Sequence, residues 1–341
     1  MGKKTIVLGV LLLGIILLAA IFVGVGYYTY FLNAPQEEVS KPLNFAVMVH
    51  LEKEAKITSA EVYKGTNQKV SEIIDLFEKY GAKATIESSE SYANGAIKYG
   101  KNDNVLSYSL SKGMGVGTHC DMGDVAQITA KDFNAIKSRI DALVGPENNL
   151  GCSGGFFDGN WVETASLGGF KYLDGVVMLA YLGVPLENRP INPDTGAPYS
   201  DDEITNVYYH DPVLPVKDRI YPRMLKDTQD LNEDKDGTLL LITGGLGEIS
   251  SLYEGRKNCF PDCRLTKEDT NYIMEQIDYA NSIKDDSKTS ALVIHFPVRT
   301  LTPQTKGLVE DWLEKMEEYQ NQGKIKWVTV KEIYEDYIQN N

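Results

Sequence analysis

The longest uncharged stretch of the sequence covers residues 5–36, and it constrains most strongly where the chain can be placed. Most residues in 6–25 are Leu, Ile, Val, Ala or Gly, and as one helix this run would cross roughly 30 Å of hydrocarbon. A cleaved signal peptide is the alternative, but its apolar core usually has only about 7–15 residues. This run is longer and lacks a clear small-x-small cleavage site, so we predict a transmembrane anchor.

The residues on either side of the apolar run indicate its orientation. Lys3 and Lys4 precede it, and positive charge favours the cytoplasmic side of a membrane. Four aromatic residues follow it, as is typical of a membrane interface: Tyr27, Tyr28, Tyr30 and Phe31. We therefore expect a cell-membrane protein that crosses the membrane once, with its remaining chain outside.

The rest of the sequence is expected to form one globular domain behind a linker. We expect a cytoplasmic tail at 1–4, the anchor at 5–31, a linker at 32–42 and the domain at 43–341. About 300 residues are long for one ordinary domain but normal for an α/β barrel. The net charge of −14 repels phosphate backbones, so nucleic acid is not an expected partner.

The four cysteines are even in number and would lie outside, where disulfides persist. Cys259 and Cys263 frame a Cys-Phe-Pro-Asp-Cys loop, which predicts a local disulfide, with a pair of metal ligands as the alternative. Cys120 and Cys152 can also pair, and the sequence leaves this open.

Strand-like runs alternate with amphipathic helical runs through the domain, which predicts a parallel sheet wrapped by helices. The first unit is expected to be a buried strand at 45–49, a helix stopped by Gly81, and a strand at 84–86. Further strands are expected at 105–110, 171–177, 239–242, 292–294 and 327–330. Helical faces are expected around Ile136 and Trp312, and a capping box at Thr266 and Asp269 is expected to open another helix. Six prolines in 185–221 predict a long surface excursion.

Three of the four histidines stand at the ends of strand-like runs: His50, His119 and His295. In a β/α barrel the carboxyl ends of the strands build the active site, so these side chains are expected to converge. A lone histidine at such a place is more often a satisfied polar residue than a ligand. His210 lies in the proline-rich excursion and is expected to be a loop residue.

Two histidines have a carboxylate two residues later, as His50 with Glu52 and His119 with Asp121. Residues i and i+2 of a strand point to the same side. Two such pairs offer nitrogen and oxygen ligands to Zn²⁺ or a similar divalent ion and leave a position for water. The pairs therefore favour a metal or acid/base site, in which a metal makes hydroxide available near neutral pH.

Four segments resemble, in the same order, the motifs of the polysaccharide deacetylase (NodB-homology) family, also called carbohydrate esterase family four, over roughly residues 43–338. Residues 45–52 stand in the place of its first motif, a strand ending in Thr-Phe-Asp-Asp-Gly. Residues 112–123 resemble its second, a glycine-rich strand ending in His-x-x-x-His. Residues 151–172 resemble its third motif region, and 291–332 is similar to its closing Leu-x-His strand, helix and last strand.

The resemblance implies a distorted β/α barrel that removes an acetyl group from a glycan with metal-bound water. It implies that His119 is a metal ligand and that His295 helps the leaving amine. The sequence departs from the family where His50 and Leu51 replace the Asp-Asp pair, and where Gly123 replaces the second histidine of His-x-x-x-His.

Our hypothesis for the altered site is that His50 and Asp121 replace the missing ligands and that Glu52 is the general base. The expected protein is a membrane-anchored, zinc-dependent carbohydrate deacetylase-like hydrolase that acts on an envelope glycan. Trp161 is singled out as a possible glycan contact, with core packing as the alternative. Two other functions remain open: a degenerate barrel that binds glycan without turnover, and a glycosidase using Glu52 and Asp121.

Overall fold

The computed structural model describes residues 40–340 except 53–55, 101–102, 121–127, 209, 212–213 and 260–261. All of them except Ser40 belong to a compact unit that spans Lys41–Asn341. The predicted anchor at 5–31 lies outside the described residues, as does Asp121. Within the described ranges, no helix has the length and apolar character that a membrane crossing needs.

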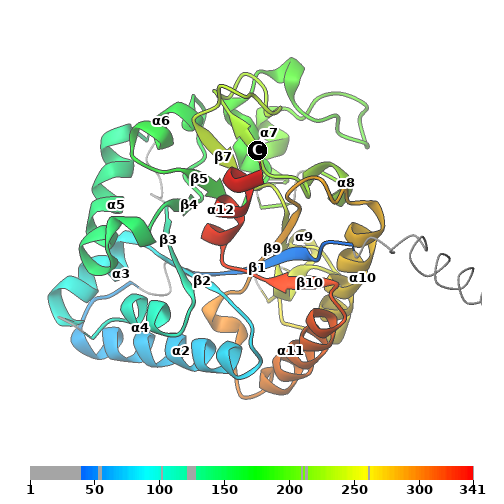
Figure 1. Cartoon of the computed structure of the whole chain (residues 1–341). Helices are drawn as coiled ribbons and strands as arrows, with labels where there is room; N and C mark the ends of the chain where they lie inside the picture. The colour runs from blue at the N-terminus through cyan, green and yellow to red at the C-terminus, as the bar shows by residue number, and fades with distance from the viewer. Residues whose placement is uncertain are drawn as a thin grey trace, which may run out of the picture. The chain divides into compact units, whose positions relative to one another are not determined.

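A ten-stranded curled sheet forms the centre of this unit (Figure 1). Its strands are β1 (Leu43–Leu51), β2 (Thr85–Ser88), β3 (Gly115–His119), β4 (Gly151–Ser153), β5 (Tyr172–Asp174), β6 (Arg223–Leu225), β7 (Leu239–Leu241), β8 (Gly245–Glu248), β9 (Ala291–His295) and β10 (Ile325–Trp327). Their order is β6-β7-β5-β4-β3-β2-β1-β9-β8, with β10 added to β1. The β6–β7 pair is antiparallel and the other pairs are parallel, so most strands end at the same edge.

Helices surround the curled sheet, as Figure 1 shows. They are α2 (Ala60–Lys79), α3 (Glu90–Gly95), α4 (Val105–Ser111), α5 (Ala130–Val144), α6 (Trp161–Leu167), α7 (Asp201–Asn206), α8 (Val216–Arg219), α9 (Arg256–Cys259), α10 (Lys267–Ile283), α11 (Lys306–Asn321) and α12 (Val330–Asn340). The longer ones bury one apolar face: α2, for example, buries Val70, Ile73 and Phe77 at helical spacing. The fold is therefore a mixed α/β half-barrel, as the alternating pattern predicted.

The last helix, α12, closes one end of the half-barrel. Its Val330, Ile333 and Tyr337 pack in one apolar cluster with residues of β1, β5, β7 and β9. The Asp336 carboxylate accepts hydrogen bonds from Asn44 Nδ2 at 3.3 Å and Thr289 Oγ1 at 2.8 Å, at the amino-terminal ends of β1 and β9. The opposite end, where the parallel strands finish, is left for polar side chains.

Two expected strands differ from the structure. Residues 105–110 form helix α4, because the Asn104 side chain accepts a hydrogen bond from Ser107 N and caps a helix there. The following strand begins instead at Gly115. The strand expected at 327–330 lies earlier in the chain, since β10 covers Ile325–Trp327 and α12 begins at Val330.

Candidate metal centre

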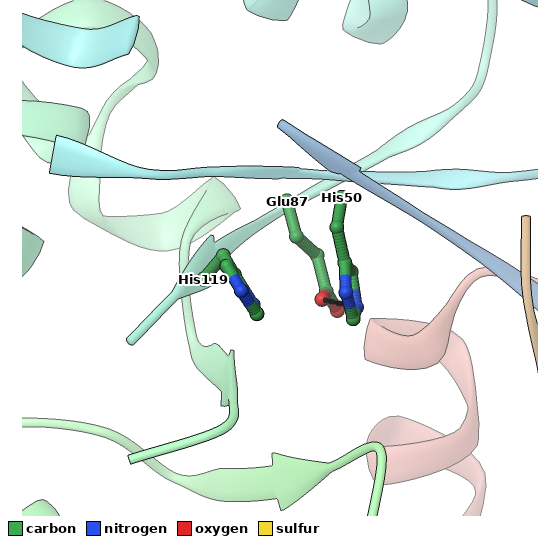
Figure 2. A group of neighbouring side chains, drawn as sticks. All are labelled: His50, Glu87 and His119. Carbon is green, nitrogen blue, oxygen red and sulfur yellow. Dashed lines mark ion pairs between the residues drawn. The ribbon is translucent and has the colours of Figure 1, made fainter. Parts of the chain in front are cut away.

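Five polar side chains lie in register at the carboxyl ends of neighbouring strands. His50 of β1 pairs with Glu87 of β2, His119 of β3 pairs with Ser153 of β4, and Ser153 pairs with Asp174 of β5. Paired residues of parallel strands point to the same side of the sheet, which here is the interior. Figure 2 shows His50, Glu87 and His119 projecting from their strands into one common space.

The His50 imidazole is at the centre of this group. Its ring is stacked between those of His119 and His295, with ring centroids 4.3 and 4.0 Å apart. Its Nε2 is 2.9 Å from Glu87 Oε2, and its Nδ1 is 3.3 Å from Glu52 Oε1. The same Glu52 oxygen is 3.9 Å from His295 Nε2, so five side chains meet within a few ångströms.

Gly117 provides the space that Glu87 occupies. The two residues are register partners on β3 and β2, and a Cβ at Gly117 would lie 3.1 Å from Glu87 Cγ. The Glu87 side chain is 1% exposed, so its carboxylate is inside the half-barrel and not at the rim. Gly117, in the glycine-rich run before His119, therefore leaves room for the Glu87 side chain in the site.

Burial and neighbouring charges determine the protonation of His50 and Glu87, the central pair of the site. Burial lowers the pKa of His50, but the contact with Glu52 and the charges of Glu52 and Glu87 outweigh it and raise that pKa to about 10. Burial raises the pKa of Glu87, and His50 outweighs this effect, so the pKa of Glu87 is below its ordinary value. Without a metal, His50 is therefore an imidazolium held by carboxylates.

The pKa values of the groups around His50 and Glu87 are shifted in different directions. Burial would raise the pKa of Glu52, but the contact with His50 lowers it well below its usual range. Burial and the neighbouring positive charge of His50 lower the pKa of His295 well below its ordinary value, so this ring is neutral. Burial and the charge of Glu87 raise the pKa of Asp174 well above its ordinary value, so Asp174 is protonated.

The donor set fits a divalent ion. His50, Glu87 and His119 each offer one ligand atom, and these atoms all lie within 4.8 Å of one another. His50 Nε2 and Glu87 Oε2 are buried, and among the described residues neither has a hydrogen-bond partner of good geometry, although they are 2.9 Å apart. Two imidazoles and a carboxylate are a common zinc donor set, and an ion between them would satisfy both buried atoms.

Ser153 supports the third donor. Its Oγ is 2.9 Å from His119 Nδ1, and both side chains are buried. Contacts of this kind fix the orientation of a ligating imidazole. The adjacent Cys120 and Cys152 are joined by a disulfide, which ties the end of β3 to β4 beside this contact.

The structure brings together four of the predicted site residues: His50, Glu52, His119 and His295. Asp121 lies outside the described residues, so its predicted role as a ligand stays a prediction. The predicted disulfide between Cys259 and Cys263 is confirmed.

Trp161 does not have the exposed position that a glycan contact needs. Its side chain is fully buried, its Nε1 donates to the Ala180 carbonyl at 2.9 Å, and its ring packs edge-on against Phe156. The structure therefore shows the alternative, core packing. The indole is large enough to fill the space beneath the 178–183 turn, which explains why an aromatic residue stands here.

Sequence reasoning missed Glu87, Ser153 and Asp174. Glu87 directly follows the expected strand at 84–86, and Asp174 lies inside the expected strand at 171–177. An acidic residue in a strand buried on both faces is unusual, and this signal could have identified both.

Comparisons with known proteins agree with this fold. No protein-family model and no curated protein matches the sequence. A protein named as a polysaccharide deacetylase from Mycobacterium smegmatis has a similar structure, with TM-score 0.52, 12% identity, and 89% of this chain and 92% of that chain covered. A second polysaccharide deacetylase, from Pseudomonas aeruginosa PAO1, has a TM-score of 0.53 and 11% identity, with 88% of this chain and 92% of that chain covered. The Puue allantoinase has a TM-score of 0.53 and 12% identity, with 89% of this chain and 93% of that chain covered.

The fold of this chain is therefore the one seen in these polysaccharide deacetylases and in the allantoinase. These similarities extend over almost the whole of each protein, at identities of 11–12%. The chain is a divergent representative of this fold, as the order of the sequence motifs predicted.

Proposed function

We propose that this protein is a metal-dependent hydrolase that removes acetyl groups from a glycan outside the cytoplasm, anchored by residues 5–31. The observation that carries the proposal is the pair of buried atoms His50 Nε2 and Glu87 Oε2, which lack good hydrogen bonds and lie with His119 in a set of zinc-type donors. The deacetylase fold supports the reaction class, and the anchor predicted from the sequence supports the location.

In this proposal His50, Glu87 and His119 hold the ion, which we propose to be Zn²⁺, and Asp121 remains a proposed further ligand. The bound ion supplies Lewis-acid chemistry to a carbonyl group and to water. Glu87 stands in for the carboxylate that β1 lacks, because it is in register with His50 on the adjacent strand.

Glu52 and His295 carry the proton in this proposal. The Glu52 carboxylate is about one-third exposed, so a water molecule can reach it, and it accepts the proton of the attacking water. His295 Nε2 is 3.9 Å from Glu52 Oε1 and passes this proton to the leaving amine.

The test is acetate release by the full-length protein in detergent from N-acetylated and O-acetylated oligosaccharides. We expect activity that a chelator removes and Zn²⁺ restores. Glu52→Gln and His295→Asn should abolish this activity without loss of the zinc held by His50, Glu87 and His119. Allantoin belongs in the panel, since one structural neighbour is an allantoinase. Zinc binding without turnover of any substrate would identify a glycan-binding protein instead, and release of free sugar without acetate would identify a glycosidase.

A further inference from the structure

The two ring nitrogens of His50 face two different sets of ligands. On the Nε2 side is Glu87, at 2.9 Å, and on the Nδ1 side is Glu52, at 3.3 Å. His295 Nε2 lies 3.9 Å from the Glu52 oxygen. His50, Glu52 and His295 thus form a second set of three donors, with one ligand atom each and all atoms within 4.8 Å of one another.

The second donor set has the same chemical character as the first. It contains two imidazoles and one carboxylate, and His295 Nε2 is a buried atom without a hydrogen-bond partner among the described residues. Two ligands of one zinc ion are at most about 4.2 Å apart, twice the ~2.1 Å bond length. Glu52 Oε1 is within this limit of both His50 Nδ1, at 3.3 Å, and His295 Nε2, at 3.9 Å. Only the two imidazoles would therefore have to approach one another, by at most about 0.6 Å.

We infer that this protein has a second divalent-cation site, formed by His50 Nδ1, Glu52 and His295, and that an ion there inhibits the hydrolase. The inference rests on the proposed function, since it assumes that the first ion occupies the Nε2 side. An ion at the second site binds the two groups that carry the proton in the reaction. The protein is therefore active with one ion and inactive with two.

The second site is weaker than the first for two reasons. Glu52 is 35% exposed whereas Glu87 is 1% exposed, so water competes for the carboxylate of the second site. Both ions also share His50, which must lose both of its ring protons to bind through both nitrogens, next to a second positive ion. We expect the second ion to bind at least tenfold more weakly than the first.

The experiment measures zinc per chain by elemental analysis after dialysis of the full-length protein against increasing Zn²⁺, together with the thermal unfolding temperature. We expect two ions in the wild type and in Glu314→Gln, an exposed carboxylate on α11 that serves as the matched control. Glu52→Gln and, as a second variant of the same site, His295→Asn are expected to keep only the tighter ion. Acetate release by the wild type should rise with the first equivalent and fall at least tenfold with the second.

The outcomes separate the two proposals. One ion in the wild type and in Glu52→Gln would overturn the second site and leave the proposed function intact. No ion in any variant would remove the metal from the proposed function and the second site together. Two ions in both Glu52→Gln and His295→Asn, or loss of an ion in Glu314→Gln, would place the weaker ion elsewhere on the surface and overturn the inference.

Discussion

At the scale of single residues, the site depends on Gly117, which has no side chain and so leaves room for Glu87. Gly117 lies opposite Glu87 on the neighbouring strand, and any Cβ there would be 3.1 Å from Glu87 Cγ. Contacts this short force the neighbour to move by a few tenths of an ångström, and ligand positions in metal sites tolerate little displacement.

Gly117→Ala is therefore expected to weaken zinc binding at the Nε2 side by about tenfold, equivalent to about 1.4 kcal/mol. Gly65→Ala is the matched control, because a Cβ in this part of α2 meets nothing within 4 Å. The control should leave zinc affinity unchanged and raise the free energy of unfolding by roughly 0.5–1 kcal/mol. Competition with a zinc-binding dye measures the affinities, and equal values for both variants would contradict the role of Gly117.

His50 makes the stability of the metal-free protein depend on pH. Its pKa is about 10 in the folded protein, against about 6.5 for an ordinary histidine. The stability that this shift contributes is complete below pH 6.5 and is lost as the pH rises to about 10. We expect the free energy of unfolding by urea, with chelator present, to fall by a few kcal/mol over this range. His50→Gln should lack this part of the decrease, and an identical pH dependence in both proteins would refute the assignment.

The histidines could be predicted from the sequence because they end recognisable strands, whereas Glu87, the buried carboxylate beside His50, could not. Glu87 is close to His50 only because β2 pairs with β1 with one particular register. Pairing register depends on the packing of the whole sheet, and the local sequence does not determine it. Spacing along a strand paired His50 with Glu52, which the structure places 3.3 Å apart, and His119 with Asp121, which stays a prediction.

At the scale of elements, the end of β3 is fastened to β4 by the Cys120–Cys152 disulfide. Cys120 follows His119, and Cys152 precedes Ser153, so the bond flanks the contact that orients the His119 ring. A bridge between residues 32 apart also restricts the unfolded chain.

Replacing Cys120 and Cys152 together by Ser is expected to lower the free energy of unfolding by ~3–4 kcal/mol. The Cys259–Cys263 bridge closes a loop with a sequence separation of only 4, so the corresponding double variant should lose about 2 kcal/mol. Urea unfolding of both variants gives the comparison. A larger loss for the short loop would show that strain or local packing outweighs the entropy of the chain.

The elements themselves were largely predictable where apolar periodicity and capping agreed. The Thr266 and Asp269 capping box opens α10 as expected, and Gly81, with φ of 62°, follows the end of α2. Residues 105–110 were assigned wrongly because Val, Leu and Tyr suit strands, while the cap at Asn104 selected the helix. The short strand β8 was missed, since Gly-Leu-Gly-Glu has no apolar alternation.

At the scale of the whole unit, the interior depends on α12 at one end and leaves the other end for chemistry. Ile333 is fully buried where α12 closes the half-barrel, and Ile338 on the same helix is 50% exposed. The two isoleucines differ only in what surrounds them, which makes them a matched pair for testing this closure.

Ile333→Ala is expected to lower the free energy of unfolding by about 2–5 kcal/mol, the usual cost of a cavity in a core. Ile338→Ala should change it by less than about 0.5 kcal/mol. Chemical unfolding followed by tryptophan fluorescence measures both. Similar values for the two variants would mean that α12 does not form part of the core.

The order of strands in the sheet affects how the chain can fold while it is being synthesised. Asn44, at the start of β1, hydrogen-bonds Asp336 of α12, 292 residues further along the chain. The parallel partner of Asn44 on β9 is Ala291, 247 residues further along (291 − 44). At about 5–20 residues per second, synthesis of that interval takes roughly 12–50 s, during which the apolar strand β1 has no β9 beside it. One edge of β1 therefore stays unpaired for most of the synthesis of the chain, and an unpaired edge of this kind favours aggregation until the last strands emerge.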